Sequence, residues 1–238
     1  MQNLWNSLKD NLFCVLICLL ISALVFGLAL LCEKLSPAEE KSSASPLRRI
    51  TVTALSSALA AVLMLLDFPL FFAPSFYKLD FSELPILICG FALGPVAGVT
   101  AEFIKVLLKV MIKGTATAFV GEFSNFVLGC SFILPAAALY RRHKTKKRAA
   151  LGLTLGTLVM TVFGSFFNAY YLIPQYSRLF GLSVEALVSA GTAINPYINS
   201  VSTLVLLAVV PFNLLKGLLV SLLTMLLYKY IKKILIGS

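Results

Sequence analysis

The sequence predicts an all-α polytopic membrane protein, on the basis of its composition, the length of its apolar runs and the placement of its charges. Hydrophobic residues make up 59% of the 238 residues, charged residues make up 13%, and the mean hydropathy is +0.94. Apolar runs of about 20 residues recur along the chain, which is the length a helix needs to cross the hydrocarbon of a bilayer. This composition excludes a soluble globular domain.

The charges support the same fold class. The net charge of +10 comes mainly from short basic segments between the apolar runs, the densest being residues 141–148. Basic segments of this kind mark the cytoplasmic loops of membrane proteins, whereas nucleic-acid binding is not indicated. We therefore predict a multi-pass protein of the cell membrane in a lipid bilayer, with residues 141–148 and the C-terminus on the cytoplasmic side. The five cysteines form no CxxC pair, so no metal site or disulfide is expected.

The first apolar run, residues 11–32, predicts a transmembrane helix that precedes the main bundle. A cleaved signal peptide is the alternative, but Lys9 is offset by Asp10 and no small-residue cleavage site precedes Cys32. Residues 33–46 form a polar linker. The chain is thus divided into residues 1–46, with this helix and linker, and residues 47–238, with the remaining membrane domain.

Six further helices are predicted from the later apolar runs. They cover residues 50–66, 82–93, 95–112, 119–139, 151–173 and 204–228. Ala54 and Ala58 form a small-xxx-small pair in the first of them, which allows another helix to approach closely. A short helix is expected near residues 184–190, within the longer connection 174–201.

Residues 67–83 interrupt the apolar pattern with two prolines and many aromatic side chains. One interpretation is a belt of aromatics at the membrane interface. The other is a loop that folds over a cavity and covers a flat ligand. The sequence alone leaves both open.

Lys216 is the most unusual residue of the last apolar run. It lies at the midpoint of residues 204–228, roughly 18 Å from either end of a helix. An ammonium group at that depth costs several kcal/mol unless it has partners. Asn213 shares its face, and Pro211 removes a hydrogen bond and loosens the backbone just upstream. Either Lys216 is held by a carboxylate or by carbonyl groups for packing alone, or Asn213 and Lys216 hold a ligand.

Other polar residues also fall within apolar runs. Glu102 and Lys105 have the spacing of a pair on one helix face, so we expect a structural ion pair. Glu122 and Asn125 share a face near the start of the next helix, and Asn168 lies close to the far end of the helix after it.

Four sequence blocks, in this order, resemble the riboflavin-specific substrate-binding subunit, or S component, of energy-coupling factor (ECF) transporters. They are KLDFSELP at 78–85, GFALGP at 90–95, GEFSNF at 121–126 and PFNLLKG at 211–217. The resemblance covers residues 47–236 and implies a six-helix S-component core, to which this chain adds one N-terminal transmembrane helix.

The resemblance implies a binding subunit and not an enzyme. Such a subunit takes up riboflavin from outside the cell and delivers it through a membrane-embedded coupling subunit driven by two cytoplasmic ATPase subunits. It implies that Ala54 and Ala58 contact the coupling subunit. No cofactor is expected, because riboflavin is the transported ligand. The chain has no GxxxxGK[ST] stretch and so is not itself the ATPase.

The expected site suits the chemistry of riboflavin. Lys216 and Asn213 supply a strong donor and a group that both donates and accepts, which matches the carbonyl and imide edge of the isoalloxazine ring. The ribityl chain is assigned to Asn168, Asn125 and Glu122. The face of the ring is assigned to Phe71, Phe76, Tyr77 and Phe81.

An ion-coupled secondary transporter of a small organic solute is the alternative function. In that case Glu102, Glu122 and Lys216 form a relay and Pro211 marks a broken helix. No half of the sequence resembles the other, however, so inverted repeats are not visible. An enzyme is disfavoured because the sole histidine, His143, lies in the basic segment and no HExxH or GxSxG motif is present.

Overall fold

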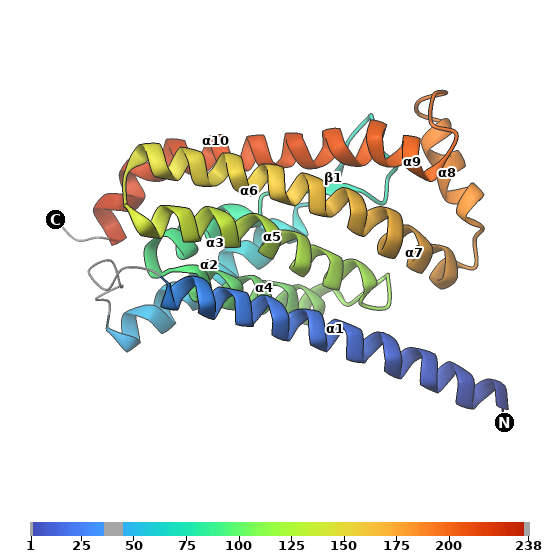
Figure 1. The fold of residues 1–238 in the computed structure, drawn as a ribbon, viewed down its shortest axis with the longest axis horizontal. Helices are drawn as coiled ribbons and strands as arrows, with labels where there is room; N and C mark the ends of the chain where they lie inside the picture. Colours follow the sequence, from blue (N-terminus) through green and yellow to red (C-terminus); the bar gives the residue numbers. More distant parts are fainter. Residues whose placement is uncertain (1, 36–44, 236–238) are drawn as a thin grey trace.

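The computed structural model describes residues 2–35 and 45–235, in which long helices run side by side along one axis and a small hairpin lies toward one end (Figure 1). The helices are α1 Gln2–Lys34, α2 Pro46–Leu65, α3 Glu83–Leu93, α4 Pro95–Lys113, α5 Val120–Arg142, α6 Lys146–Phe167, α7 Ile173–Phe180, α8 Val184–Thr192, α9 Val201–Leu204 and α10 Val210–Leu235. Strands β1 Phe68–Pro69 and β2 Lys78–Leu79 pair antiparallel. The predicted helices are confirmed in position, and so is the short helix in the connection 174–201.

Two π-helical turns change the expected helix boundaries. The turns Asn168–Leu172 and Val205–Val209 each end two residues before a proline, Pro174 and Pro211 respectively. A proline has no N–H to donate, and the wider turn shifts the hydrogen-bond register so that the helix continues through it. The expected end of the predicted helix 151–173 was therefore wrong, because α7 carries that helix on to residue 180. The loosening expected upstream of Pro211 takes the form of the second π turn.

Four helices within the described part of the chain are long and apolar enough to cross a membrane. They are Pro46–Leu65, Val120–Arg142, Lys146–Phe180 and Val201–Leu227. The count of six such spans in the core is not reproduced, because α3 has only 11 residues and α4 carries four charged residues. The structure thus supports a multi-pass helical membrane protein without fixing the number of its crossings.

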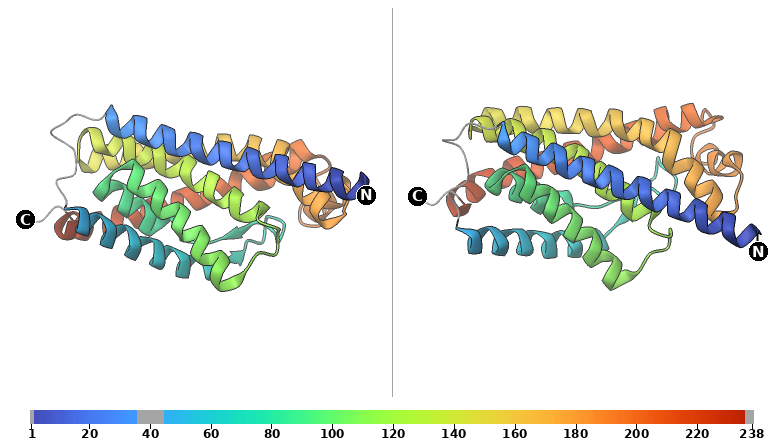
Figure 2. Two further views of the ribbon diagram at one scale, coloured as in Figure 1. Left: turned by 90° about the horizontal axis from the view of Figure 1, so that it is seen from below. Right: turned by 60° about the horizontal axis from the view of Figure 1, so that its bottom comes forward.

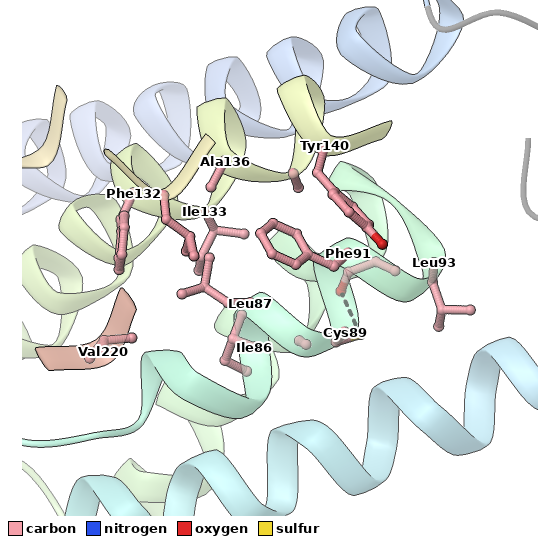
Figure 3. Close-up of a cluster of buried hydrophobic side chains, with 14 of the residues drawn as sticks. Ile86, Leu87, Cys89, Phe91, Leu93, Phe132, Ile133, Ala136, Tyr140 and Val220 are labelled. Atoms are coloured by element: carbon pink, nitrogen blue, oxygen red, sulfur yellow. Dashed lines mark hydrogen bonds between the residues drawn. The ribbon is translucent and has the colours of Figure 1, made fainter. Parts of the chain in front are cut away.

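An apolar core joins α3, α5, α6 and α10 (Figure 3). Leu87 of α3 extends toward Phe132 and Ile133 of α5, and Ile86 belongs to the same cluster. Gly156 of α6 faces α5 closely, since a Cβ there would lie 2.5 Å from the Phe132 carbonyl oxygen. Close backbone approach at small residues is how membrane helices gain packing energy. This core packs together the helices that carry the polar residues described below.

Helix α1 packs lengthwise against α4 and α5 (Figure 2). Ala29 is fully buried there, and the Phe26 ring packs against those of Phe103 and Phe126. Near its C-terminal end, Glu33 pairs with Arg49 at 3.4 Å and with Arg141 at 3.3 Å. The predicted N-terminal helix is thus part of the folded structure; the side chains of residues 1–17 lie outside the described set.

The basic segment 141–148 is not a loop along its whole length, as was expected. Helix α5 extends to residue 142, and α6 already begins at residue 146. Arg141 is buried and donates a hydrogen bond to the Leu93 carbonyl at 3.1 Å, against the turn at Gly94. Its charge is used to join helices and not to face water.

Candidate ligand-binding site

The aromatic segment after α2 folds back as the β1–β2 hairpin and packs toward the end of the bundle where α7, α8 and α9 lie (Figure 1). The Tyr77 hydroxyl donates a hydrogen bond to Asn168 Oδ1 at 2.9 Å, and Asn168 Nδ2 donates to the Gly164 carbonyl at 2.7 Å. Burial raises the pKa of Tyr77, so its hydroxyl stays a neutral donor. Asn168 therefore anchors the hairpin to the π turn of the α6–α7 helix.

Lys216 is held by two carboxylates that follow the hairpin. Its Nζ lies 3.2 Å from Asp80 Oδ2 and 3.1 Å from Glu83 Oε1. Asp80 Oδ1 also accepts a hydrogen bond from the Ser82 backbone N–H at 2.8 Å. Burial alone raises the pKa of Asp80, but the ammonium groups of Lys216 and Lys105 hold it below its ordinary value. The carboxylate is therefore kept ionised, as a buried ion pair requires.

A second buried lysine extends this network. Lys105 Nζ donates to Glu102 Oε1 at 2.6 Å, Ser82 Oγ at 3.1 Å and Asn125 Oδ1 at 3.0 Å. Glu83 Oε1 lies 3.6 Å away, between the two lysines. The predicted Glu102–Lys105 pair is confirmed. Three acids and two lysines from α3, α4, α10 and the segment after β2 thus form one connected buried cluster.

Two adjoining cavities open beside this cluster. The smaller, of about 110 Å³, is lined among others by Phe76, Tyr77, Asn125, Asn213 and Lys216. The larger, of about 360 Å³, shares Phe76 and Asn125 with it. A cavity of this second size is within the range of small-molecule sites, and the shared lining residues make the two neighbours.

The amide of Asn213 is the clearest sign of a ligand site. Its Nδ2 is buried and has no hydrogen-bond partner among the residues that the structure describes. A buried donor without a partner costs free energy, and native proteins keep very few of them. Asn213 and Lys216 both line the smaller cavity, and the Asn213 Nδ2 atom lies close to Gly164 of α6, where an added Cβ would come within 2.8 Å of it.

Glu122 lines the larger cavity but is already well satisfied. It pairs with Lys109, and its Oε2 accepts hydrogen bonds from Thr115 at 2.8 Å and from Thr117 at 2.9 Å. These bonds tie the α4–α5 connection to the first turn of α5. Glu122 therefore shapes the mouth of the site, and any contact with a ligand must compete with these three partners.

Not all of the predicted residues gather at the cavities. Phe71 is 91% exposed and packs edge-on against Phe72, while the Phe81 ring faces Phe68. Neither Phe71 nor Phe81 is among the residues that line the two cavities, and Asn168 is used to hold Tyr77.

Sequence reasoning missed Asp80 and Glu83, which are the partners of Lys216. The signal for them was present, because an intramembrane lysine needs acids and both lie in the block 78–85 that carries the family resemblance. It also did not foresee that Lys105 bonds Asn125, which lies on a different helix.

These features define a class of protein: a helical membrane protein with a polar pocket beneath an aromatic hairpin. A family profile described as "ECF transporter, substrate-specific component" matches residues 48–228. The chain belongs to this family of ECF transporter S components.

Relatives and a solved structure agree with this assignment. Riboflavin transporter RibU of Staphylococcus aureus (strain TCH60) is 34% identical over 182 residues, which are 76% of this chain and 89% of the relative. Riboflavin transporter FmnP of Bacillus subtilis (strain 168) is 34% identical over 175 residues, 73% of this chain and 86% of the relative. A solved structure, the S component of a bacterial ECF transporter, matches with a TM-score of 0.63 at 32% identity and covers 80% of this chain and 99% of its own.

Proposed function

We propose that this chain binds riboflavin from outside the cell and delivers it through a membrane-embedded coupling subunit driven by two cytoplasmic ATPase subunits. The observation that carries the proposal is the unpartnered Asn213 amide beside Lys216, in a cavity beneath the hairpin. The similarity to proteins named riboflavin transporters supports the choice of ligand. In this function the chain is a binding subunit and not an enzyme.

The polar groups of the smaller cavity match the imide edge of the isoalloxazine ring. Lys216 and the Asn213 Nδ2 group donate to its carbonyl and ring-nitrogen acceptors. Glu83 lines the same cavity and is the group that accepts from an imide N–H. The Asp80 carboxylate, 3.2 Å from Lys216 Nζ, supplies the opposite charge that this ammonium group needs inside the bundle.

The apolar parts of the ligand are assigned to the hairpin. Phe76 and Tyr77 line the smaller cavity and cover the ring, with Phe71 and Phe81 closing over it when the hairpin tightens. The ribityl chain extends toward Asn125 and Glu122 in the larger cavity, with Asn168 behind Tyr77.

Docking on the coupling subunit is assigned to α2. Ala54 and Ala58 are exposed on this helix, where their small side chains let a partner helix approach closely. In this arrangement the α5–α6 turn and the C-terminus face the cytoplasm, and the hairpin faces outward. The core is the six-helix domain of residues 47–238, and residues 1–46 add one crossing. The start of the family match at residue 48 supports this division.

The experiment is a riboflavin titration of the purified full-length chain in detergent, read by quenching of riboflavin fluorescence. We expect tight binding by the unaltered chain and a loss on the order of 100-fold in Lys216→Met combined with Asn213→Ala, because two or three donor contacts disappear together. Lys147→Met, an exposed lysine on α6, is the matched control and should bind normally. Unchanged affinity in the double variant would rule out the site.

Coupling to ATP is tested separately. After reconstitution with a coupling subunit and ATPases in vesicles, we expect riboflavin uptake to require ATP and to survive collapse of the proton gradient. Uptake by this chain alone, driven by a proton gradient, would instead favour the ion-coupled alternative.

A further inference from the structure

Lys105 occupies a position from which it cannot touch a ligand directly. Its side chain has no exposed surface, and among the described residues it is not part of the lining of either cavity. Its ammonium group is surrounded by Glu102, Ser82, Asn125 and Glu83. Burial this complete, with this many partners, is costly to build for packing alone.

The bond to Asn125 has a directional consequence. A lysine ammonium has donors only, so it pairs with the oxygen of an amide and never with its NH₂ group. The 3.0 Å contact from Lys105 Nζ to Asn125 Oδ1 therefore fixes the orientation of the Asn125 amide, with its oxygen toward Lys105. The opposite end, Nδ2, is the end free to serve a ligand, and Asn125 lines both cavities.

The same polarity recurs at two neighbouring positions of the smaller cavity. Asn213 has an Nδ2 group without a hydrogen-bond partner among the described residues, and Lys216 has an ammonium group; both residues line this cavity. With Asn125 oriented by Lys105, three side chains that line the smaller cavity carry N–H donors. A ligand with hydrogen-bond acceptors opposite these groups can bind. A ligand with a donor opposite Asn125 is disfavoured, because two donors then face each other.

We propose that Lys105 is a positioning residue: it holds the Asn125 amide with its NH₂ group toward the cavities and thereby makes this point of the site a hydrogen-bond donor. The inference rests on the proposed function and deepens it, because it assigns a polarity to one contact of the flavin site. If Lys105 had only a structural role, it would neutralise Glu102 and Glu83, and ligand binding through Asn125 would not depend on it.

The test is a double-mutant cycle on riboflavin affinity with the full-length chain in detergent. Glu102→Gln is introduced in every member, so that Lys105→Met leaves no uncompensated charge on Glu102. We expect Lys105→Met to weaken binding about tenfold, the effect of one lost hydrogen bond to the ligand, and Asn125→Ala to weaken it by a similar factor. Combined, they should cost no more than Asn125→Ala alone, because Lys105 acts through Asn125.

Two further variants separate positioning from packing. Glu102→Gln alone keeps the Lys105–Asn125 bond and should bind riboflavin normally. Asn125→Asp keeps the shape and an oxygen for Lys105 but replaces the donor by an acceptor, so we expect affinity to fall at least as far as in Asn125→Ala. Thermal unfolding of the ligand-free variants establishes that each is folded.

The outcomes distinguish this inference from the proposed function. Multiplicative losses from Lys105→Met and Asn125→Ala, or wild-type affinity in Asn125→Asp, would overturn the positioning role while riboflavin binding by the unaltered chain still stood. Absence of riboflavin binding by the unaltered chain would overturn the proposed function and this inference with it.

Discussion

Lys216 and Lys105 are both buried lysines of the helical bundle, and both lie close to Glu83, yet of the two only Lys216 lines one of the two cavities. Lys216 contacts two acids and also lines the smaller cavity. Lys105 contacts Glu102, Ser82 and Asn125 and is enclosed by protein. A charge inside the membrane indicates a functional site in both cases. Whether the lysine lines the cavity decides if it can contact a ligand or only hold other residues in place.

The largest expected effect separates the two lysines by stability. Lys105→Met leaves Glu102 without its partner at a fully buried position, which costs about 3–5 kcal/mol. Lys216→Met leaves Asp80 and Glu83 with Lys105 still close, so the cost is smaller. We expect the ligand-free midpoint of thermal unfolding to fall further in Lys105→Met than in Lys216→Met, by on the order of 5 °C. Riboflavin affinity, in contrast, should fall further in Lys216→Met than in Lys105→Met.

The control for this comparison is Lys105→Met with Glu102→Gln, which removes both charges and should recover much of the lost stability. Equal melting of the two single variants would mean that the lysines are equivalent and that the contrast drawn between them is wrong.

An intermediate effect concerns pH and the Asp80–Lys216 pair. The pKa of Asp80 is lowered in the folded protein, so its contribution to stability is complete above the unfolded value of about 3.9 and is lost as the pH falls through the folded value. We expect this contribution to be constant between about pH 5 and pH 8 and to decline only below about pH 4. The difference in melting temperature between the unaltered chain and Asp80→Asn, followed with pH, measures it. A decline that begins near neutral pH would contradict the assignment.

The smallest expected effect concerns the hairpin that brings Asp80 to Lys216. Tyr77→Phe keeps the aromatic ring but removes the hydrogen bond to Asn168, which is worth about 0.5–1.5 kcal/mol. We expect riboflavin to dissociate a few-fold faster, measured by displacement after stopped-flow mixing. Tyr197→Phe is the matched control, because that tyrosine is 80% exposed and lines neither cavity. An equal change in both variants would show that the hairpin is not anchored through Asn168.

The sequence predicted most of the helices because apolar run length is a local property of the chain. It also singled out Asn213 and Lys216, since a lysine at the centre of an apolar run is anomalous without any knowledge of its neighbours. The boundaries were predicted less well: residue 173 was taken as an end, whereas a π turn carries the helix through Pro174. Proline marks a lost hydrogen bond, but the surrounding packing decides whether the helix stops.

By itself, then, the sequence determined a helical membrane protein, its S-component motifs and the presence of a buried polar site. Only the tertiary structure decided which acids neutralise which lysines. Asp80 and Lys216 are 136 residues apart, and no local pattern specifies their pairing. It likewise decided that Lys105 bonds Asn125 and that Phe71 points outward. The physical reason is that run length and periodicity are local properties of the chain, whereas the partner of a buried charge is set by which helices pack together.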